Sequence, residues 1–270
     1  MAENPIDNLK EDFEGFTDLV GSITDLVNQG PSTYPSLYAV IENIHEAILP
    51  VAYSLLALYF LLDLVNKSMN FAFFRWETVV SCLVKLIFAK FVMESTFELL
   101  EAIFGISAYV TNLVGVEGSS LALYDINWSA MEEDYQSAGW FQKQLYEFKL
   151  MPFQWALQAV KIVITLVIFG RLFELLIYTA VSPIPIATFI HDSLSGTGKR
   201  FVMDYAAVCL QGIIIIVGCV VYASIATGSL FGGFTGSGGN IELWKGLLSA
   251  LALLLVVIKS GSWARKLTGA

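Results

Sequence analysis

The chain has 270 residues, of which 56% are hydrophobic and 14% are charged, whereas soluble domains carry about 25% charged residues. This composition, with a mean hydropathy of +0.67, excludes a single soluble domain, because too few polar side chains remain to cover its surface. It predicts an all-α, multi-pass membrane protein. The net charge of −9 is unevenly spread, since seven of the 24 acidic residues precede residue 26, where the only base is Lys10.

Residues 1–36 are predicted to form an amphipathic helix outside the membrane. Apolar side chains recur at alternating steps of four and three residues, which places them on one helical stripe: Leu9, Phe13, Phe16, Val20, Ile23 and Val27. The opposite face is acidic, whereas helices that lie on anionic lipid usually carry basic residues there. We therefore expect the stripe to cover a protein partner or a sister subunit, with packing on the protein's own membrane domain as the alternative.

Residues 37–270 are predicted to form a membrane domain of five spans. A membrane helix needs about 20 mainly apolar residues, and five segments meet that requirement: 47–65, 79–97, 159–181, 206–226 and 241–258. The first span is expected to begin as early as residue 37, and the second to continue as far as residue 110. An outside loop over 115–152 and a cytoplasmic loop over 182–200 complete the predicted domain.

The distribution of Lys and Arg predicts the orientation of these spans, because cytoplasmic loops carry an excess of basic residues. The loops and tail assigned to one side hold seven bases: Lys67, Arg75, Lys199, Arg200, Lys259, Arg265 and Lys266. The other side holds three: Lys10, Lys143 and Lys149. We therefore predict an outside N-terminus and a cytoplasmic C-terminus, which an odd number of spans permits.

Charged side chains interrupt the second and third predicted spans. Lys90, Glu94, Glu98 and Glu101 follow one another at steps of four, four and three, so they share one helix face, and Lys85 precedes them. Arg171 and Glu174 are three residues apart on the third span and can form an ion pair.

An ionisable side chain at membrane depth costs roughly 3 kcal/mol on insertion scales, so each of these groups needs a partner, water or a polar cavity. Snorkelling and local ion pairs account for Lys161, Glu98 and Glu101, which lie near predicted span ends. The other charged side chains are predicted to line a path or a seam between subunits: Lys85, Lys90, Glu94, Arg171 and Glu174.

No catalytic, metal-binding or cofactor-binding set is recognisable. His45-Glu46 begins like a zinc-protease motif, but Leu49 stands where the second histidine belongs, so His45 is interpreted as part of an interfacial cluster with Glu42 and Glu46. The Gly-Lys pair before Arg200 lacks the Ser or Thr that would hold magnesium in a phosphate-binding loop. We therefore expect neither enzymatic activity nor a cofactor.

The stretch "VSPIPIATFIHD" ends the third predicted span. Pro183 and Pro185 disfavour the helical conformation at the residues before them, so the helix is expected to stop near Val181 and to leave Ser182 and Ile184 outside the helical region. The apolar residues that follow predict a short turn at the cytoplasmic interface of the membrane.

At this point the chain resembles a known family, the TrbL-like polytopic inner-membrane subunits of type IV secretion and conjugation systems. The resemblance rests on "FRWETVVSCLVKLIFAKFVMESTFELLEAIFGI" at 74–106, on "LFELLIYTAVSPIPIATFIHD" at 172–192, and on the layout of an outside helix followed by five spans. The chain is most similar to versions carried by mobile elements of Gram-positive bacteria.

The resemblance implies several copies around an axis in the cytoplasmic membrane, in contact with other membrane subunits of the secretion machine. They would form part of the path for single-stranded DNA–protein or protein cargo, with energy from partner ATPases. Because nucleic-acid grooves are normally basic and the outside segments here are acidic, only transient contact with the cargo is expected. The alternative is a secondary transporter that uses intramembrane Lys, Arg and Glu as coupling groups.

Overall fold

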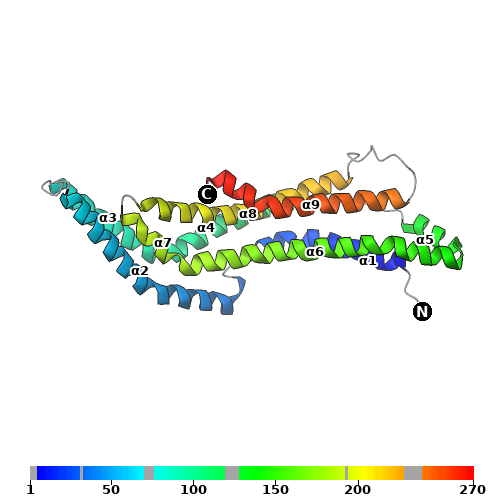
Figure 1. Cartoon of the computed structure of the whole chain (residues 1–270), viewed down its shortest axis with the longest axis horizontal. Coiled ribbons are helices and arrows are strands. Elements are labelled where there is room, and N and C mark those ends of the chain that lie inside the picture. The colour runs from blue at the N-terminus through cyan, green and yellow to red at the C-terminus, as the bar shows by residue number, and fades with distance from the viewer. Residues whose placement is uncertain (1–4, 31–32, 70–75, 119–127, 192–193, 228–238) are drawn as a thin grey trace. The chain divides into compact units, whose positions relative to one another are not determined.

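The computed structural model of the chain describes residues 5–30, 33–69, 76–118, 128–191, 194–227 and 239–270 (Figure 1). Within these ranges every regular element is a helix, which confirms the predicted all-α fold. In chain order the elements are α1 (Pro5–Val27), α2 (Pro35–Met69), α3 (Trp76–Glu94), α4 (Thr96–Gly118), α5 (Trp128–Ser137), α6 (Trp140–Val181), α7 (Pro183–Ile186), the 3-10 helix η3 (Ala187–Ile190), α8 (Ser195–Thr227) and α9 (Gly239–Thr268).

Four of the described helices are long and apolar enough, by length and composition, to cross a membrane: α2, α4, α8 and α9. The first, fourth and fifth predicted spans fall in α2, α8 and α9. The second predicted span is corrected, because its first part forms α3 and the membrane candidate is Thr96–Gly115 of α4. The third predicted span, 159–181, is continuous helix within α6 but is not among the four candidates.

Whether α6 crosses the membrane therefore decides whether the two termini lie on the same side or on opposite sides. With α6 as a fifth crossing helix, the two termini lie on opposite sides of the membrane, as the basic residues predict. With the four candidates alone, both termini lie on the same side. The outside N-terminus and the cytoplasmic C-terminus stay predictions.

The predicted outside loop over 115–152 is largely helical where the structure describes it. It contains the end of α4, all of α5 and the first turns of α6, whereas 119–127 lie outside the described residues. A hydroxyl–carboxylate hydrogen bond from Tyr135 to Glu147 (3.4 Å) joins α5 to α6. Burial, and secondarily the negative charge of Glu147, raises the pKa of Tyr135 above its ordinary value.

The chain divides into two compact units. Unit 1 consists of Met1–Asn28, Tyr109–Phe169 and Gly212–Ser260. Unit 2 consists of Gln29–Ala108, Gly170–Gln211 and Gly261–Ala270. Each unit has its own hydrophobic core.

The core of unit 1 is built on the apolar stripe of α1. Leu9, Phe16 and Ile23 are buried against side chains of α6, α8 and α9 (Figure 1 shows α1 beside α6). The amphipathic helix is thus confirmed, with bounds of Pro5–Val27. The expectation that a partner or sister subunit covers its stripe is wrong, because the protein's own helices occupy that surface.

An ion pair across helices also holds α1 in unit 1. The Asp12 carboxylate lies 3.0 Å from Lys161 Nζ and accepts a hydrogen bond from Gln158 Nε2 (3.3 Å), both on α6. Lys161 therefore has a counterion on α1, where sequence reasoning expected snorkelling or a local pair. Five other acidic side chains of α1 stay exposed: Asp7, Glu11, Glu14, Asp18 and Asp25.

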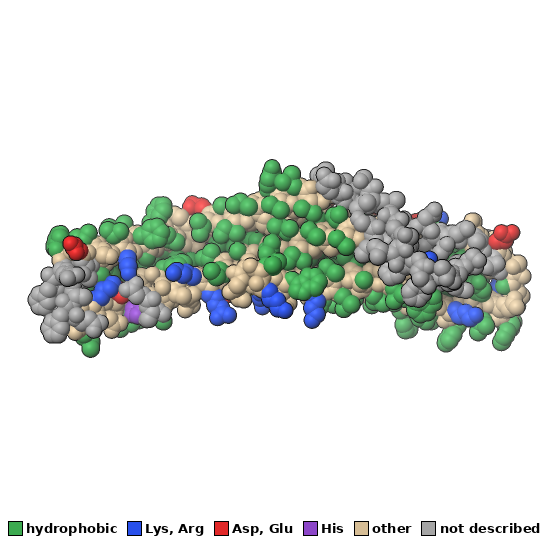
Figure 2. All heavy atoms as spheres, turned by 90° about the horizontal axis from the view of Figure 1, so that it is seen from above, with side chains coloured by type: hydrophobic (Ala, Val, Ile, Leu, Met, Phe, Trp, Pro, Cys, Tyr) green, Lys and Arg blue, Asp and Glu red, His purple; other side chains and the backbone are tan. Residues whose placement is uncertain are grey.

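The outward sides of the long helices are rich in large apolar side chains. On α6 of unit 1, Phe148, Trp155, Ile162 and Leu166 recur along one side of the helix and are all largely exposed. Figure 2 shows hydrophobic side chains over much of the face that it views. Apolar exposure on this scale is typical of a surface that contacts lipid or another membrane subunit.

In unit 2 the short elements α7 and η3 form a buried centre. Ile186 and Ala187 have no exposed surface and Ile190 is nearly as enclosed. The two elements pack against α2 and α3, and their core includes Leu56 of α2 and Met93 of α3. We call this segment, Ser182–His191, the α7–η3 segment. The expected short turn is thus buried inside unit 2, and its position at the cytoplasmic interface of the membrane stays a prediction.

The two prolines start a new helix instead of excluding one. α6 ends at Val181, as predicted, but Ser182 keeps right-handed helical angles (φ −51°, ψ −34°) and Ile184 lies inside α7. The prediction of non-helical Ser182 and Ile184 is therefore wrong. Proline suits the first turn of a helix because the N–H groups there have no intrahelical partner, and α1 and α2 also begin at prolines.

Candidate functional site

The charged side chains predicted on the second span are divided between two helices. α3 ends at Glu94, Ser95 belongs to neither helix, and α4 begins at Thr96, so Lys90 and Glu94 do not share a helix with Glu98 and Glu101. Backbone hydrogen bonds from Ser95 N to Phe91 O and from Leu99 N to Ser95 O still link the two helices. The prediction of one continuous charged face is wrong in this respect.

Lys90 and Glu94 form an exposed ion pair on α3, with Lys90 Nζ 3.6 Å from Glu94 Oε1. The Tyr53 hydroxyl of α2 donates to the same Glu94 oxygen (2.9 Å). Farther along, the Tyr38 hydroxyl of α2 donates to Glu101 of α4 (3.4 Å). Two tyrosines of α2 thus reach the carboxylates of α3 and α4, while Lys85 is partly buried on α3.

Apolar side chains surround the exposed Lys90–Glu94 pair on the same helix. Ile87, Phe88 and Phe91 each leave more than half of their surface exposed. An exposed salt bridge that faces lipid is unfavourable, because hydrocarbon offers no hydrogen bonds to the charged groups. The face of α3 that carries the pair therefore suits water or another protein subunit.

Arg171 lies deep in unit 2, with 3% of its surface exposed. Its Nε donates to the carbonyl of Val208 (2.9 Å) and its NH2 group to the carbonyl of Cys209 (3.4 Å), both on α8. The guanidinium also lies over the Phe104 ring of α4, 5.9 Å from its centre. Because the Ser107 hydroxyl of α4 donates to the same Cys209 carbonyl (2.8 Å), these contacts join α4, α6 and α8.

Glu174, predicted as a partner for Arg171, forms an ion pair with a residue of another helix. Its Oε1 accepts a hydrogen bond from Arg265 NH2 of α9 at 2.8 Å. Arg171 and Glu174 therefore connect α6 to α8 and to α9, respectively. Neither partner was recognisable from the sequence, since Arg265 was assigned only to the C-terminal tail.

Both histidines of the chain contact or belong to the α7–η3 segment. His45 of α2 is buried, and its Nδ1 lies 3.2 Å from the Thr179 carbonyl oxygen and 3.3 Å from Ser182 Oγ. His191 is also buried, and Asn66 Nδ2 of α2 lies 3.4 Å from its Nε2. The helix α2 thus holds both ends of the segment through polar contacts.

His45 is thus buried inside unit 2, whereas its predicted place in a cluster at the membrane interface stays a prediction. Ile41, His45, Ala52 and Leu56 lie at steps of four, seven and four, which places all of them on the buried face of α2. That spacing was the feature of the sequence from which the burial of His45 could have been predicted. Glu42 and Glu46, which the sequence grouped with His45, point to the exposed side.

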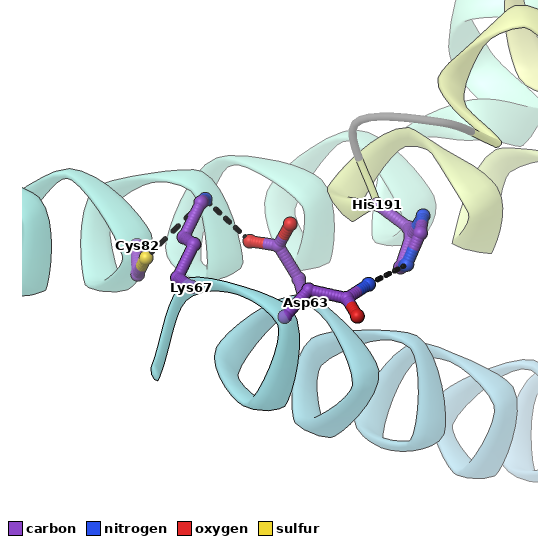
Figure 3. Close-up of polar contacts among 5 residues, drawn as sticks. Asp63, Lys67, Cys82 and His191 are labelled. Atoms are coloured by element: carbon purple, nitrogen blue, oxygen red, sulfur yellow. Dashed lines mark hydrogen bonds and ion pairs between the residues drawn. The ribbon is translucent and has the colours of Figure 1, made fainter. Parts of the chain in front are cut away.

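A second polar cluster lies where the end of α2 meets α3, and sequence reasoning missed it. Figure 3 shows Lys67 between Asp63 and Cys82: its Nζ lies 2.5 Å from Asp63 Oδ2 and 3.5 Å from Cys82 Sγ. Asp63 is 4% exposed, so the Lys67 ammonium is the group that compensates its buried charge. The i,i+4 spacing of Asp63 and Lys67 was the only hint in the sequence.

Among the described residues, no group of three or more His, Cys, Asp or Glu side chains is arranged to hold a metal ion. The polar contacts instead connect helices: α2 to α3, α4 and the α7–η3 segment, and α6 to α8 and α9. Unit 2 is thus a helical assembly held together by hydrogen bonds and ion pairs as well as by its core.

The family of the chain follows from comparison with known proteins. The family model described as TrbL/VirB6 plasmid conjugal transfer like protein matches residues 16–183, which is more than half of the chain. The chain belongs to this family. The match runs from α1 to the first residue of α7 and includes the 74–106 stretch, Arg171 and Glu174.

Family membership makes this TrbL/VirB6-family chain a membrane component of a conjugal transfer, or type IV secretion, system. It also implies contact with other subunits of that machinery. Neither the comparison with curated proteins nor the comparison with solved structures finds a match.

Proposed function

We propose that this TrbL/VirB6-family protein is a channel and scaffold subunit in the cytoplasmic membrane. Several copies form part of the path by which single-stranded DNA–protein or protein cargo crosses. The protein performs no catalysis in this proposal, and partner ATPases supply the energy. Its contact with the cargo is transient, because a strand that bound tightly would not move on.

The exposed Lys90–Glu94 pair carries this proposal. The pair lies on α3 close to Ile87, Phe88 and Phe91, which are largely exposed. Lipid cannot compensate the two charges, whereas an aqueous path or a facing subunit can. The Tyr53 hydroxyl orients the Glu94 carboxylate from α2, so the pair is held in place by the fold.

The test is the frequency of transfer from a donor strain that lacks only this gene and carries a complementing copy. We expect transfer to fall to background in the deletion, to return with the wild-type copy, and to drop at least tenfold with Lys90→Glu, in which two carboxylates face each other one turn apart. The double variant Lys90→Glu with Glu94→Lys restores the pair and should recover most of the transfer.

The matched control is Lys10→Glu on α1. Lys10 and Glu14 are also exposed, four residues apart and 3.9 Å from each other, so the change in helix charge is the same. Transfer should stay near the wild-type level. Unchanged transfer in the gene deletion would contradict the conjugation role, and substrate uptake by the transporter alternative would then be measured. Equal losses of transfer frequency for Lys90→Glu and Lys10→Glu would show that α3 does not line the path.

A further inference from the structure

We propose that a polar cavity of unit 2 binds the phosphate group of an anionic membrane lipid. The cavity lies among α6, α8 and the end of α9 and has a volume of about 400 Å³. This volume falls within the range of ordinary small-ligand sites, about 300–1,000 Å³. Its polar lining comes from Glu174, Gln211, Ser262, Arg265 and Lys266.

The charges around the cavity favour an anion. Among the side chains that line the cavity, Arg265 and Lys266 are positive and Glu174 is negative. The ion pair between Glu174 and Arg265 (2.8 Å) fixes the guanidinium at the wall, while the Lys266 side chain stays exposed and able to turn inward. A phosphate group accepts hydrogen bonds from such cations more strongly than from neutral donors.

Neutral donors complete the lining. Ser262 contributes a hydroxyl and Gln211 an amide from opposite helices. Gly261 lies against that amide: a side-chain carbon at position 261 would stand 3.4 Å from Gln211 Nε2. With glycine at this position, no side chain separates the amide from the cavity.

The position along the helices fits a lipid headgroup. The cavity lies near the end of the membrane-candidate segment of α9, Leu243–Thr268, where a headgroup would meet the polar residues. Trp263 and Leu267 of α9 and Phe173 and Ile177 of α6 are exposed and offer apolar surface for acyl chains. Basic pockets between membrane helices are known to suit anionic headgroups, and tryptophan favours this depth.

Binding is measured on the full-length protein in lipid nanodiscs of phosphatidylcholine with increasing phosphatidylglycerol, by native mass spectrometry of the lipid that stays bound. We expect phosphatidylglycerol to be retained in preference to phosphatidylcholine. Lys266→Gln should weaken that retention about tenfold, as expected for loss of one charge-assisted contact. Ser262→Ala should weaken it less.

Lys259→Gln is the matched control, because it removes the same charge from an exposed position of α9 that does not line the cavity. Its retention of phosphatidylglycerol should match the parent. Equal losses for Lys259→Gln and Lys266→Gln would show general surface attraction and overturn the site. All variants must elute from a sizing column as the parent does, which shows that they are folded. If Lys266→Gln does not elute like the parent, Ser262→Ala still tests the site.

Two further probes distinguish the source of the phosphate. Inorganic phosphate at millimolar concentration should leave the retained lipid unchanged. Displacement of the lipid by inorganic phosphate would assign the cavity to a free anion, and displacement by a single-stranded oligonucleotide would assign it to nucleic acid. Either result would overturn the lipid proposal. Lipid binding here does not depend on the transfer function.

Discussion

Units 1 and 2 differ in what they bury. In unit 1, the buried polar side chains among the described residues are small hydroxyls: Thr111, Ser249 and Ser260. Unit 2 buries larger polar and charged groups, namely His45, Asp63, Arg171, His191 and Gln211, in addition to several hydroxyls. Both units have apolar cores of comparable kind, so the difference lies in the polar contacts alone.

This contrast indicates different roles for the two units. An apolar core tolerates small shifts of its helices, because contacts between hydrocarbon side chains have little direction. A buried ionisable group requires particular partners, since leaving it without them is strongly unfavourable. Unit 2 therefore has one preferred arrangement of α2, α3, α4, α6 and α8, and it also carries the exposed pair on α3 that the proposed path requires.

The largest effect is expected from Arg171→Glu, which places a carboxylate against the carbonyls of Val208 and Cys209. We expect the free energy of unfolding, measured by denaturant titration in detergent, to fall by more than about 3 kcal/mol. Lys161→Glu in unit 1 should lower it by about 1 kcal/mol, because both side chains of the Lys161–Asp12 pair keep some exposed surface, 24% and 14%. Equal losses in the free energy of unfolding for the two variants would contradict the proposed difference between the units.

Lys67→Met tests the second polar cluster of unit 2. The substitution leaves the Asp63 carboxylate buried without its ammonium partner, so the free energy of unfolding should fall by about 3 kcal/mol. Lys67→Met combined with Asp63→Leu should recover much of the loss, because the buried charge is then gone as well. A single variant as stable as the parent would show that the pair contributes nothing to unit 2.

His45→Leu is expected to have a smaller effect. It removes the contacts with the Thr179 carbonyl and Ser182 Oγ while keeping a side chain of similar bulk, so a loss of about 1–2 kcal/mol is expected in the same titration. Glu46→Gln, at the next and exposed position, should change stability by less than about 0.5 kcal/mol. Equal changes in stability for His45→Leu and Glu46→Gln would mean that α2 does not hold the α7–η3 segment through His45.

The sequence predicted those parts of the fold that depend on local pattern. The spacing from Leu9 to Val27 was enough to identify α1 and its buried stripe, and the apolar runs identified the cores of α2, α8 and α9. The end of α6 at Val181 followed from the prolines. Each of these features is decided by residues within a few turns of one another.

The candidate site depended on partners far away in the chain. His45 meets Ser182 across 137 residues, and Glu174 meets Arg265 across 91. No local pattern selects one such partner among many polar residues. The prolines misled for a different reason: their restriction on the preceding residue is a preference, and the packing of Ile186 and Ala187 in the core of unit 2 overrides it.

The most direct test of the account is a photoreactive amino acid placed at position 90 of the protein in a donor cell during transfer. If α3 faces the path or a subunit seam, light should crosslink position 90 to a second copy of the chain or to the cargo. The same amino acid at position 10 of α1 serves as the control and should give neither product. Crosslinks from position 90 to lipid alone, while transfer continues, would contradict the account.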